Sequence, residues 1–410
     1  MTYIEELCAA ACGAAQKLAY SDAETKNKML ESIASAIEKN ADEILRANKI
    51  DVENCPADKA AFLDRLTLDE KRIAAMAEGV RAVARIDDPV GKITAEWYTG
   101  KGLKITKVRA PIGVAAVIYE ARPNVTADAA ALCLKSGNAC VLRGGKEAIN
   151  TNKIIYGIMK NALAGNNFED GALQFIDKTD RSYAAELLKM SDYVDVVIPR
   201  GGEALKRFVL DNAKIPVIAS AGGICHVYVE KTADLKMASD IIFNAKTSRP
   251  SVCNAAETLL VDADIAEKFL PSCLARLSGA GVEIRGDEAT VKLFPKAVRA
   301  VDYDTEYEAL ILAVKVVKDC AEAIEHINRH NTKHSDAVVT NSDFVKEIFA
   351  KSVDAAAVYI NASTRFTDGF EFGFGAEMAI STQKLHARGP IGLEALTSEK
   401  YVIYGEGHIR

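Results

Sequence analysis

Cys253 lies between a polar, basic approach and an apolar, strand-like exit in the run Asn244 to Leu260. A thiol attacks only as the thiolate, which requires access and cationic or dipolar neighbours. Lys246 and Arg249 precede Cys253, and Pro250 helps to hold the approach open. The alternative is a buried core cysteine, the commonest fate of this residue type. The setting favours a nucleophile.

Two glycine pairs that carry cations follow strand-like runs. They are Leu142-Arg-Gly-Gly-Lys-Glu147 and Ile198-Pro-Arg-Gly-Gly-Glu203, which contribute Arg143, Gly144, Gly145, Lys146, Gly201 and Gly202. Glycine allows a phosphate to approach the backbone closely, and a following helix adds amide donors and a favourable dipole. Each pair is also consistent with an ordinary turn. The usual dinucleotide fingerprint, Gly-x-Gly-x-x-Gly after the first strand, is absent.

Further polar side chains could bind an anion or an oxyanion. Asn124 follows the first predicted strand, where an amide could donate to a developing oxyanion, although an ordinary Pro-Asn turn is the simpler interpretation. Arg365 lies in a long loop rich in hydroxyls and glycines, 359–377, and loops of this kind seldom exist for structure alone. Lys384 and Arg388 follow that loop. Any of these cations could clamp a carboxylate or phosphate, and a solvated surface is the alternative for each.

Composition and charge limit the class of protein. The chain has 410 residues, 49% hydrophobic and 26% charged, which predicts a globular protein with more than one domain. A net charge of -6 argues against a nucleic-acid or anionic-membrane partner. No stretch approaches a transmembrane span, and no secretory signal begins the sequence.

The cysteines predict reduced thiols and no metal site. Their number, nine, is odd, and no Cys-x-x-Cys pair repeats. Cys8 and Cys12 share a helix face in an Ala-rich segment, which packing explains better than zinc. We therefore expect a soluble cytoplasmic protein.

The periodicity predicts helices first and an alternation of strands and helices later. Apolar residues recur at helical spacing to about residue 86, with Thr67 and Glu70 as a capping box for one helix. Residues 92–107 form a hairpin around glycines, and its Trp97 suits an arm packed on another subunit.

From Gly113 onward, short apolar runs alternate with helical segments, which predicts an α/β fold with parallel sheets. The predicted strands are Gly113 to Tyr119, Ala139 to Leu142, Val194 to Ile198, Ile215 to Ala219, His226 to Val229, Thr258 to Val261, Val282 to Ile284, Ile311 to Val317, Ala337 to Thr340, Ala356 to Ile360 and Tyr401 to Tyr404.

The motifs of this chain resemble those of the γ-glutamyl phosphate reductases, a family within the aldehyde dehydrogenase superfamily. The resemblance rests on Asn-Ala-Lys-Thr-Ser-Arg-Pro-Ser-Val-Cys-Asn-Ala-Ala-Glu-Thr around Cys253 and on Val-Tyr-Ile-Asn-Ala-Ser-Thr-Arg-Phe-Thr-Asp-Gly from Val358. It extends through Leu385 to Leu396, Asp304 to Tyr307, Ala313 to Val317 and Glu120 to Thr126, and so covers most of the chain.

The resemblance implies a Rossmann-like cofactor domain, an α/β catalytic domain and a β-hairpin oligomerisation arm. These would be residues 1–90 and 110–245, residues 246–394, and residues 91–109 with 395–410. It also implies NADPH-dependent reduction of L-glutamate 5-phosphate to L-glutamate 5-semialdehyde, the second step of proline biosynthesis, through a Cys253 thioester.

The same resemblance assigns roles to single residues. Cys253 and Asn124 would be catalytic. Arg143, Gly144, Gly145, Lys146, Gly201, Gly202 and Glu306 would bind NADPH/NADP, with Glu306 on the nicotinamide ribose. Arg249, Arg365, Lys384 and Arg388 would bind substrate. The implied partners are a homo-oligomer, dimer or tetramer, and a transiently associated glutamate 5-kinase.

This chain departs from the oxidising aldehyde dehydrogenases at the residue that activates water to hydrolyse the thioester. Those enzymes carry a glutamate just before a Gly-Gly pair, whereas this chain has Ser220-Ala-Gly-Gly223 with no acid. A missing water-activating base fits reduction of an acyl donor, because hydrolysis would waste it. A CoA-acylating aldehyde dehydrogenase is the alternative that shares this absence. A binding protein with a dead site would instead have lost the nucleophile or the cationic loops, and all are present.

Overall fold

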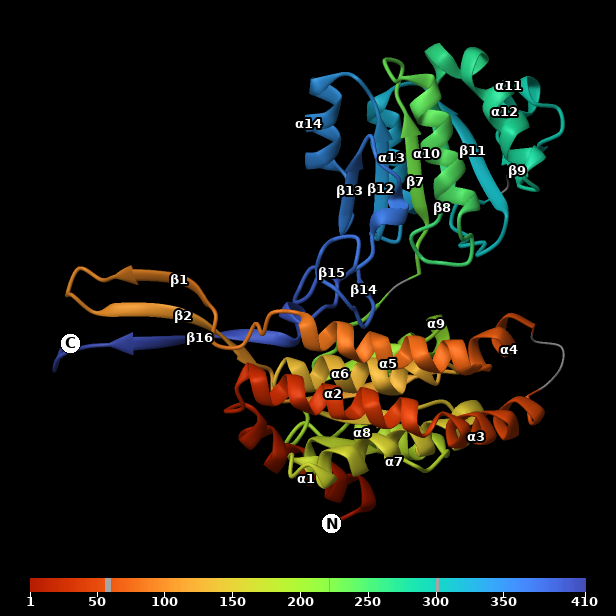
Figure 1. Ribbon diagram of the computed structural model, residues 1–410. Coiled ribbons are helices and arrows are strands. Elements are labelled where there is room, and N and C mark those ends of the chain that lie inside the picture. Colours follow the sequence, from red (N-terminus) through yellow and green to blue (C-terminus); the bar gives the residue numbers. More distant parts are fainter. Residues whose placement is uncertain (56–59, 221, 300–301) are drawn as a thin grey trace. The chain divides into compact units, whose positions relative to one another are not determined.

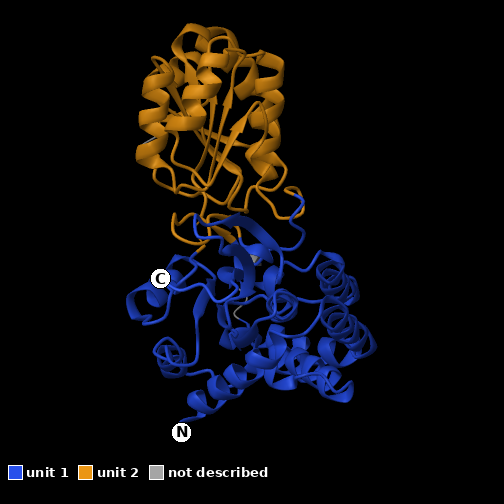
Figure 2. Cartoon of the chain, turned by 90° about the vertical axis from the view of Figure 1, so that its left-hand side faces the viewer, with its two compact units in different colours: residues 1–219, 373–379, 391–410 blue, residues 220–372, 380–390 orange. Residues whose placement is uncertain are grey.

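The computed structural model describes residues 1–55, 60–220, 222–299 and 302–410, which form two compact units (Figure 2). The first unit contains residues 1–219, 373–379 and 391–410, and the second contains residues 220–372 and 380–390. The long N-terminal segment of the first unit ends at Ala219, whereas the predicted cofactor domain extends to residue 245.

The first unit begins with helices, as the periodicity predicts. These are α1 (Tyr3–Leu18), α2 (Ala23–Lys39), α3 (Ala41–Glu53), α4 (Ala60–Leu66) and α5 (Glu70–Arg85). The predicted capping box at Thr67 and Glu70 is wrong. The Asp69 carboxylate caps α5 by accepting the Arg72 N–H at 2.7 Å, while the Thr67 hydroxyl donates to the Leu63 carbonyl at 2.7 Å. Aspartate is at least as good an N-cap as threonine, and it lies next to the helix.

The first unit then forms a four-stranded parallel sheet with the order β5-β4-β3-β6. Its elements are β3 (Val114–Tyr119), α6 (Asn124–Lys135), β4 (Ala139–Arg143), the short helix η1 (Lys146–Ala148), α7 (Ile149–Gly165), η2 (Asp170–Ala172), β5 (Leu173–Phe175), α8 (Arg181–Leu187), β6 (Val196–Arg200) and α9 (Glu203–Asn212). Every residue of β3 is buried, as expected of a parallel strand covered on both faces. The predicted strand at Ile215 to Ala219 is reduced to one bridge between Val197 and Val217.

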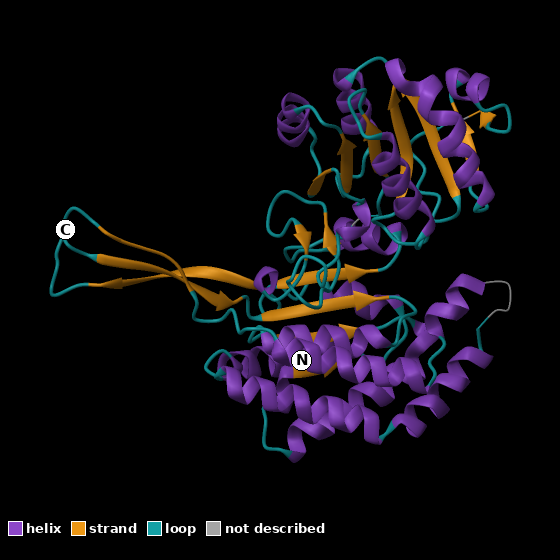
Figure 3. Cartoon of the chain, turned by 45° about the horizontal axis from the view of Figure 1, so that its top comes forward, coloured by secondary structure: helices purple, strands orange, loops and turns teal. Residues whose placement is uncertain are grey.

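An antiparallel sheet of three strands extends from the same unit (Figures 1 and 3). It contains β1 (Ile93–Tyr98), β2 (Lys104–Pro111) and β16 (Thr397–Tyr404), which follows the short helix η4 (Glu394–Leu396). The predicted hairpin is confirmed as β1 and β2, and β16 adds the predicted tail strand to its other side. All of β1 is exposed, including Trp97.

The second unit is built around a seven-stranded parallel sheet with the order β10-β9-β11-β8-β7-β12-β13. Its elements are β7 (Cys225–Val229), α10 (Leu235–Thr247), β8 (Ala256–Asp262), α11 (Ala263–Gly279), β9 (Glu283–Gly286), α12 (Glu288–Leu293), β10 (Val298–Arg299), β11 (Ile311–Val317), α13 (Cys320–His330), β12 (Ser335–Val339), α14 (Asp343–Ser352), β13 (Ala357–Ile360) and η3 (Thr364–Phe366). A short pair, β14 (Ile380–Ser381) and β15 (Gly389–Pro390), completes the unit.

Alternate residues of the central strands feed two separate cores in the second unit. Leu259 packs in the core that includes α10 and α11, whereas Tyr228 and Leu260 pack in the core that includes α13 and α14. Helices therefore cover both faces of the sheet. The predicted α/β fold with parallel sheets is confirmed.

Candidate active site

Cys253 lies in the turn between α10 and β8 and is partly exposed. The core-cysteine interpretation therefore does not hold for this residue. Burial raises the pKa of other thiols, including Cys273 to about 12 and Cys320 to about 11, which keeps them protonated. Cys253 thus combines access with a position on a turn that precedes a buried strand.

Arg365 reaches across the Cys253 turn. Its Nε donates to the Ser248 hydroxyl at 3.0 Å, and its guanidinium donates to the side-chain oxygen of Asn254. The guanidinium is half-buried, so burial lowers its pKa, and Arg249 lowers it further, while Cys253 raises it. The structure therefore places Arg365 at the nucleophile turn with Arg249 within electrostatic range, and their role toward an anion stays a prediction.

Asn254 fastens the Arg365 loop to the nucleophile turn, a role that sequence reasoning missed. Its amide donates to the carbonyls of Thr367 at 2.9 Å and Arg365 at 3.3 Å. The Thr364 hydroxyl donates back to the Asn254 carbonyl at 2.7 Å. The signal available in the sequence was an amide directly after the proposed nucleophile, and the structure shows that this amide is buried, where it needs hydrogen-bond partners.

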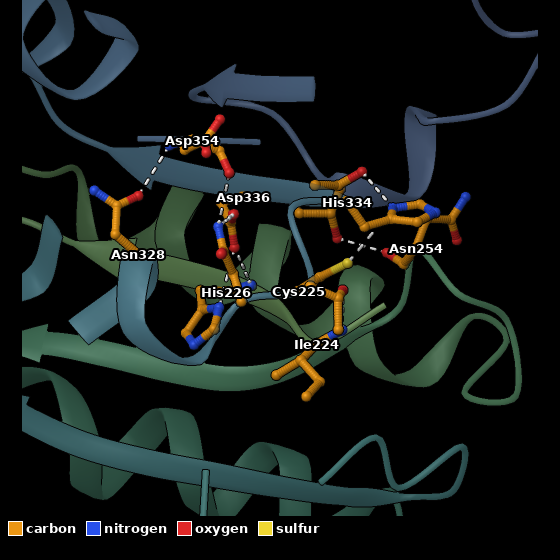
Figure 4. Close-up of polar contacts among 12 residues, drawn as sticks. Ile224, Cys225, His226, Asn254, Asn328, His334, Asp336 and Asp354 are labelled. Carbon is orange, nitrogen blue, oxygen red and sulfur yellow. Dashed lines mark hydrogen bonds and ion pairs between the residues drawn. The ribbon is translucent and has the colours of Figure 1, made fainter. Parts of the chain in front are cut away.

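Two groups fix the backbone carbonyl of Cys253. The Cys225 thiol donates to this oxygen at 3.2 Å, and a Cβ on Gly223 would stand 1.5 Å from it. Only glycine fits at such a distance, so Gly223 lies flat against the peptide of the nucleophile. The neighbouring His226 points away from Cys225 and bonds Asp336 at 3.0 Å, as strand alternation predicts (Figure 4).

Glu306 contacts the same glycine pair from a loop before β11. Its Oε1 accepts the Gly223 N–H at 2.6 Å, and a Cβ on Gly222 would meet its Oε2 at 1.9 Å. Cys253, Cys225 and Glu306 lie at the amino ends of the parallel strands or in loops that precede them, and η3, which follows β13, brings Arg365 to the Cys253 turn. Open parallel sheets usually bind ligands at the opposite edge.

Lys384 and Arg388 gather around an acid. Asp354 accepts from Lys384 at 2.9 Å and from Arg388 at 2.7 Å, and Lys333 adds a third contact at 3.1 Å. These cations hold the pKa of Asp354 well below its usual range. Both predicted substrate cations therefore already bind a carboxylate in this structure, and their role toward substrate stays a prediction.

In the first unit the predicted cofactor residues lie at the carboxyl ends of β4 and β6, two strands of the same parallel sheet. Arg143 ends β4 and donates to the Thr179 carbonyl at 3.0 Å, and burial lowers its pKa. Lys146 begins η1 and is exposed. Gly201 and Gly202 follow β6, and Gly202 caps α9. Since β3 lies between β4 and β6, the two glycine loops flank one edge of the sheet.

The glycines of these loops have side chains at close range. A Cβ on Gly144 would stand 2.1 Å from the Asn152 Nδ2, which is buried without a hydrogen-bond partner, and one on Gly145 would stand 2.8 Å from Glu147. The Gly202 N–H donates to Glu120 at 2.9 Å. The donors and the close backbone approach fit a phosphate-containing ligand, provided that the Glu120 carboxylate turns away from Gly202.

Asn124 begins α6, and its amide donates to Asp128 at 2.8 Å. It is therefore the first residue of a helix rather than a loop residue. Burial raises the pKa of Asp128 to about 6, while Asn124 lowers it. The second hydrogen of the amide is the one that could serve an oxyanion.

Buried histidines in the second unit predict a loss of stability in mild acid. Burial lowers the pKa of His326 to about 2 and of His334 to about 4, from an ordinary value of 6.5. Between those values the unfolded chain binds protons that the folded chain does not, so stability falls as pH falls below 6.5. At about pH 5.5 each histidine costs between about 1 and 2 kcal/mol.

Urea unfolding at about pH 7.5 and about pH 5.5 measures this loss, which we expect to total about 3 kcal/mol for the two histidines. His334→Asn should remove roughly half of it, whereas His408→Asn, at an exposed histidine, should remove none. An unchanged pH dependence in His334→Asn would contradict the assignment.

The described helices include none that is both long and apolar enough to cross a membrane. Within the same residues no group of three or more His, Cys, Asp or Glu is arranged to hold a metal ion.

Comparisons with known proteins give a consistent result. Residues 2–292 match the aldehyde dehydrogenase family. The chain is 53% identical to the gamma-glutamyl phosphate reductase of Ligilactobacillus salivarius over 404 residues, covering 98% of this chain and 97% of that protein. It is 51% identical to that of Enterococcus faecalis, covering 100% and 99%.

Solved structures agree with these relatives. The crystal structure of gamma-glutamyl phosphate reductase from Thermotoga maritima matches with a TM-score of 0.97 and 45% identity, covering 100% of both chains. An acetylating aldehyde dehydrogenase from Geobacillus thermoglucosidasius matches with a TM-score of 0.69 and 17% identity, covering 99% of this chain and 97% of that one. The second likeness shows the fold alone.

Proposed function

The chain belongs to the aldehyde dehydrogenase family and, within it, to the γ-glutamyl phosphate reductases, and from this premise we propose a reaction path with Cys253 as the nucleophile. The protein is an oxidoreductase of proline biosynthesis that reduces γ-glutamyl phosphate to glutamate 5-semialdehyde with a nicotinamide cofactor. The CoA-acylating alternative is not favoured, since its structural relatives share only the fold.

The first chemical step transfers the glutamyl group to Cys253. The thiolate forms a C–S bond to the acyl carbon, and the C–O bond to phosphate breaks, so phosphate leaves with the electron pair. One observation carries this assignment: the Arg365 guanidinium, fixed by Ser248 and Asn254, lies beside a partly exposed thiol. A fixed cation stabilises both the thiolate and the departing phosphate. Arg249 adds a second positive charge there.

The second step reduces the thioester, for which the nicotinamide supplies a hydride when bound. The backbone amide of Cys253 donates to the resulting alkoxide, and Asn124 is the second donor that we propose. The alkoxide then re-forms the carbonyl and expels the Cys253 thiolate, which releases the aldehyde. Ser220 stands where the oxidising enzymes have an acid, so no carboxylate at that position activates water.

We propose NADPH as the cofactor, held by the loops after β4 and β6. Arg143 and Lys146 offer positive charge for a 2′-phosphate, with Gly144 and Gly145 between them. Gly201 and Gly202 open α9 and would receive the pyrophosphate at a helix N-terminus. Glu306 would hold the nicotinamide ribose through its carboxylate. Lys384 and Arg388 remain candidates for the α-carboxylate of the substrate, in exchange for Asp354.

The proposal also covers the oligomeric state, the protein partner and the cellular compartment. The arm exposes several large apolar side chains, which suits a homo-oligomer, dimer or tetramer. They are Ile93, Trp97, Tyr98, Tyr401, Ile403 and Tyr404. Because acyl phosphates are labile, transient contact with a glutamate 5-kinase would protect the substrate. We propose a cytoplasmic location, because the odd number of cysteines in the sequence is typical of reduced thiols rather than of paired disulfides.

The test is the reverse reaction. With glutamate 5-semialdehyde as substrate, we expect reduction of NADP that requires inorganic phosphate and saturates with it. NADP should be preferred to NAD, and CoA should not replace phosphate. A rate that is independent of phosphate would rule out the acyl phosphate, and a rate that requires CoA would favour the acylating alternative.

A further inference from the structure

The second unit contains an ion pair that the proposed reaction does not use. The Lys246 Nζ lies 2.8 Å from the Glu257 Oε2, and the side chains are 0% and 2% exposed. Removing two charges from water is costly, and replacing a buried pair by apolar residues is often neutral or stabilising. Stability alone therefore does not account for this pair.

The pair is bound to the loop that carries Glu306. Glu257 uses its second oxygen, Oε1, to accept the Glu308 N–H at 3.3 Å. Glu308 has a positive φ of 50°, a left-handed conformation that glutamate rarely adopts. Such a backbone persists only where surrounding contacts hold it. Glu257 supplies one of these contacts to Glu308, which lies two positions after Glu306 in the chain.

The charges in this part of the unit explain why a lysine is needed. The pKa of Glu257 is raised above its ordinary value, chiefly by burial and also by the nearby Glu306, while Lys246 and the Glu308 N–H lower it. Lys246 also interacts with Glu306 and Cys225. The ammonium thus favours the ionised form of Glu257 beside a second acid, and an ionised Glu257 is the better acceptor for the Glu308 N–H.

We propose that Lys246 and Glu257 are positioning residues for the cofactor, because they fix the Glu308 backbone and through it the carboxylate of Glu306. This rests on the proposed function, in which Glu306 holds the nicotinamide ribose. The carboxylate of Glu306 is held from its other side by the Gly223 N–H, which donates to it at 2.6 Å. Neither Lys246 nor Glu257 touches the substrate in this proposal.

The test compares Glu257→Gln, Lys246→Met and the double variant Lys246→Met/Glu257→Met with Glu306→Gln. The readouts are the dissociation constant of NADPH, by fluorescence titration, and the KM values of NADP and phosphate in the reverse reaction. We expect all four variants to weaken NADPH binding about 10-fold or more, with the KM of phosphate changed by less than about twofold. Lys246→Arg, which keeps the charge, should recover part of the affinity.

The double variant leaves no unpaired charge and should therefore fold. Glu257→Gln and Glu306→Gln should be non-additive when combined, since they act on one contact. Lys26→Met is the matched control, because Lys26 forms a buried pair with Asp88 at 2.8 Å in the first unit. It should lower the melting temperature without a change in NADPH affinity.

Two negative outcomes are distinguishable. Weaker NADPH binding in Glu306→Gln, with none in the Lys246 and Glu257 variants, would overturn the positioning role and leave the Glu306 assignment standing. Unchanged binding in Glu306→Gln would overturn the Glu306 assignment itself and the positioning role with it. Equal losses in all kinetic constants together with a lower melting temperature would reduce the pair to a structural role and also overturn the proposal.

Discussion

Cys253→Ala is expected to lower kcat for phosphate-dependent reduction of NADP by at least about 10,000-fold. Without the thiol no thioester forms, and the chain has no second accessible nucleophile of the same chemistry at this turn. Cys225, the thiol that contacts the Cys253 carbonyl, is fully buried, and its pKa is raised well above the ordinary value by burial. It cannot replace Cys253 as a thiolate.

The measurement requires evidence that the variant is otherwise intact. The dissociation constant of NADPH and the melting temperature should both stay close to those of the parent chain. Cys320→Ala, at another partly exposed cysteine, is the matched control and should retain activity. Activity in Cys253→Ala equal to that of the parent would refute covalent catalysis by this residue.

Gly223→Ala is expected to lower kcat by about 100-fold to 1,000-fold. The new Cβ would stand 1.5 Å from the Cys253 carbonyl oxygen and 2.5 Å from its carbonyl carbon. These are backbone atoms, so the nucleophile turn must move to make room. Displacing a reacting group by about 1 Å is sufficient for a loss of this size. Kinetics of the reverse reaction, with the melting temperature measured in parallel, would show it.

Two other glycines serve as comparisons for Gly223→Ala. Gly157 lies in α7, and a Cβ there would meet nothing within 4 Å, so Gly157→Ala should retain activity and gain about 0.5–1 kcal/mol of stability. A Cβ on Gly222 would meet the far end of the Glu306 side chain, which can turn. Gly222→Ala should therefore weaken cofactor binding more than it lowers kcat. If Gly223→Ala behaved like Gly157→Ala, the carbonyl contact would have no catalytic importance.

The sequence predicted the elements of this fold better than the contacts between them. Alternating apolar runs indicated the parallel sheets, because periodicity depends on residues near one another in the chain. The motif around Cys253 indicated the nucleophile, and the glycine spacing indicated the arm hairpin. Local rules failed where two good caps competed, and Asp69 rather than Thr67 caps α5.

The contacts that define the site join distant parts of the chain. Asn254 and Arg365 are 111 positions apart, and no local pattern indicates that one binds the other. Lys246 was predicted to favour the Cys253 thiolate, yet its hydrogen bond is to Glu257. Lys384 and Arg388 were predicted to bind substrate, and in this structure Asp354 binds both. Tertiary packing decides these pairings, since each charge takes the nearest opposite charge that burial allows.

The place of Cys253 at the amino ends of the second unit's strands has a consequence for engineering. The turns at the carboxyl ends of the same strands, such as Lys231–Ala233, Lys318–Asp319 and Asn341–Ser342, carry none of the proposed catalytic or binding residues. Surface turns of this kind accept insertions when their backbone is not needed elsewhere. Here the backbone is needed, since Asn341 bonds Thr232 and Asp319 and Ser342 cap helices, so changes at these turns should lower stability and leave the chemistry at the other edge undisturbed.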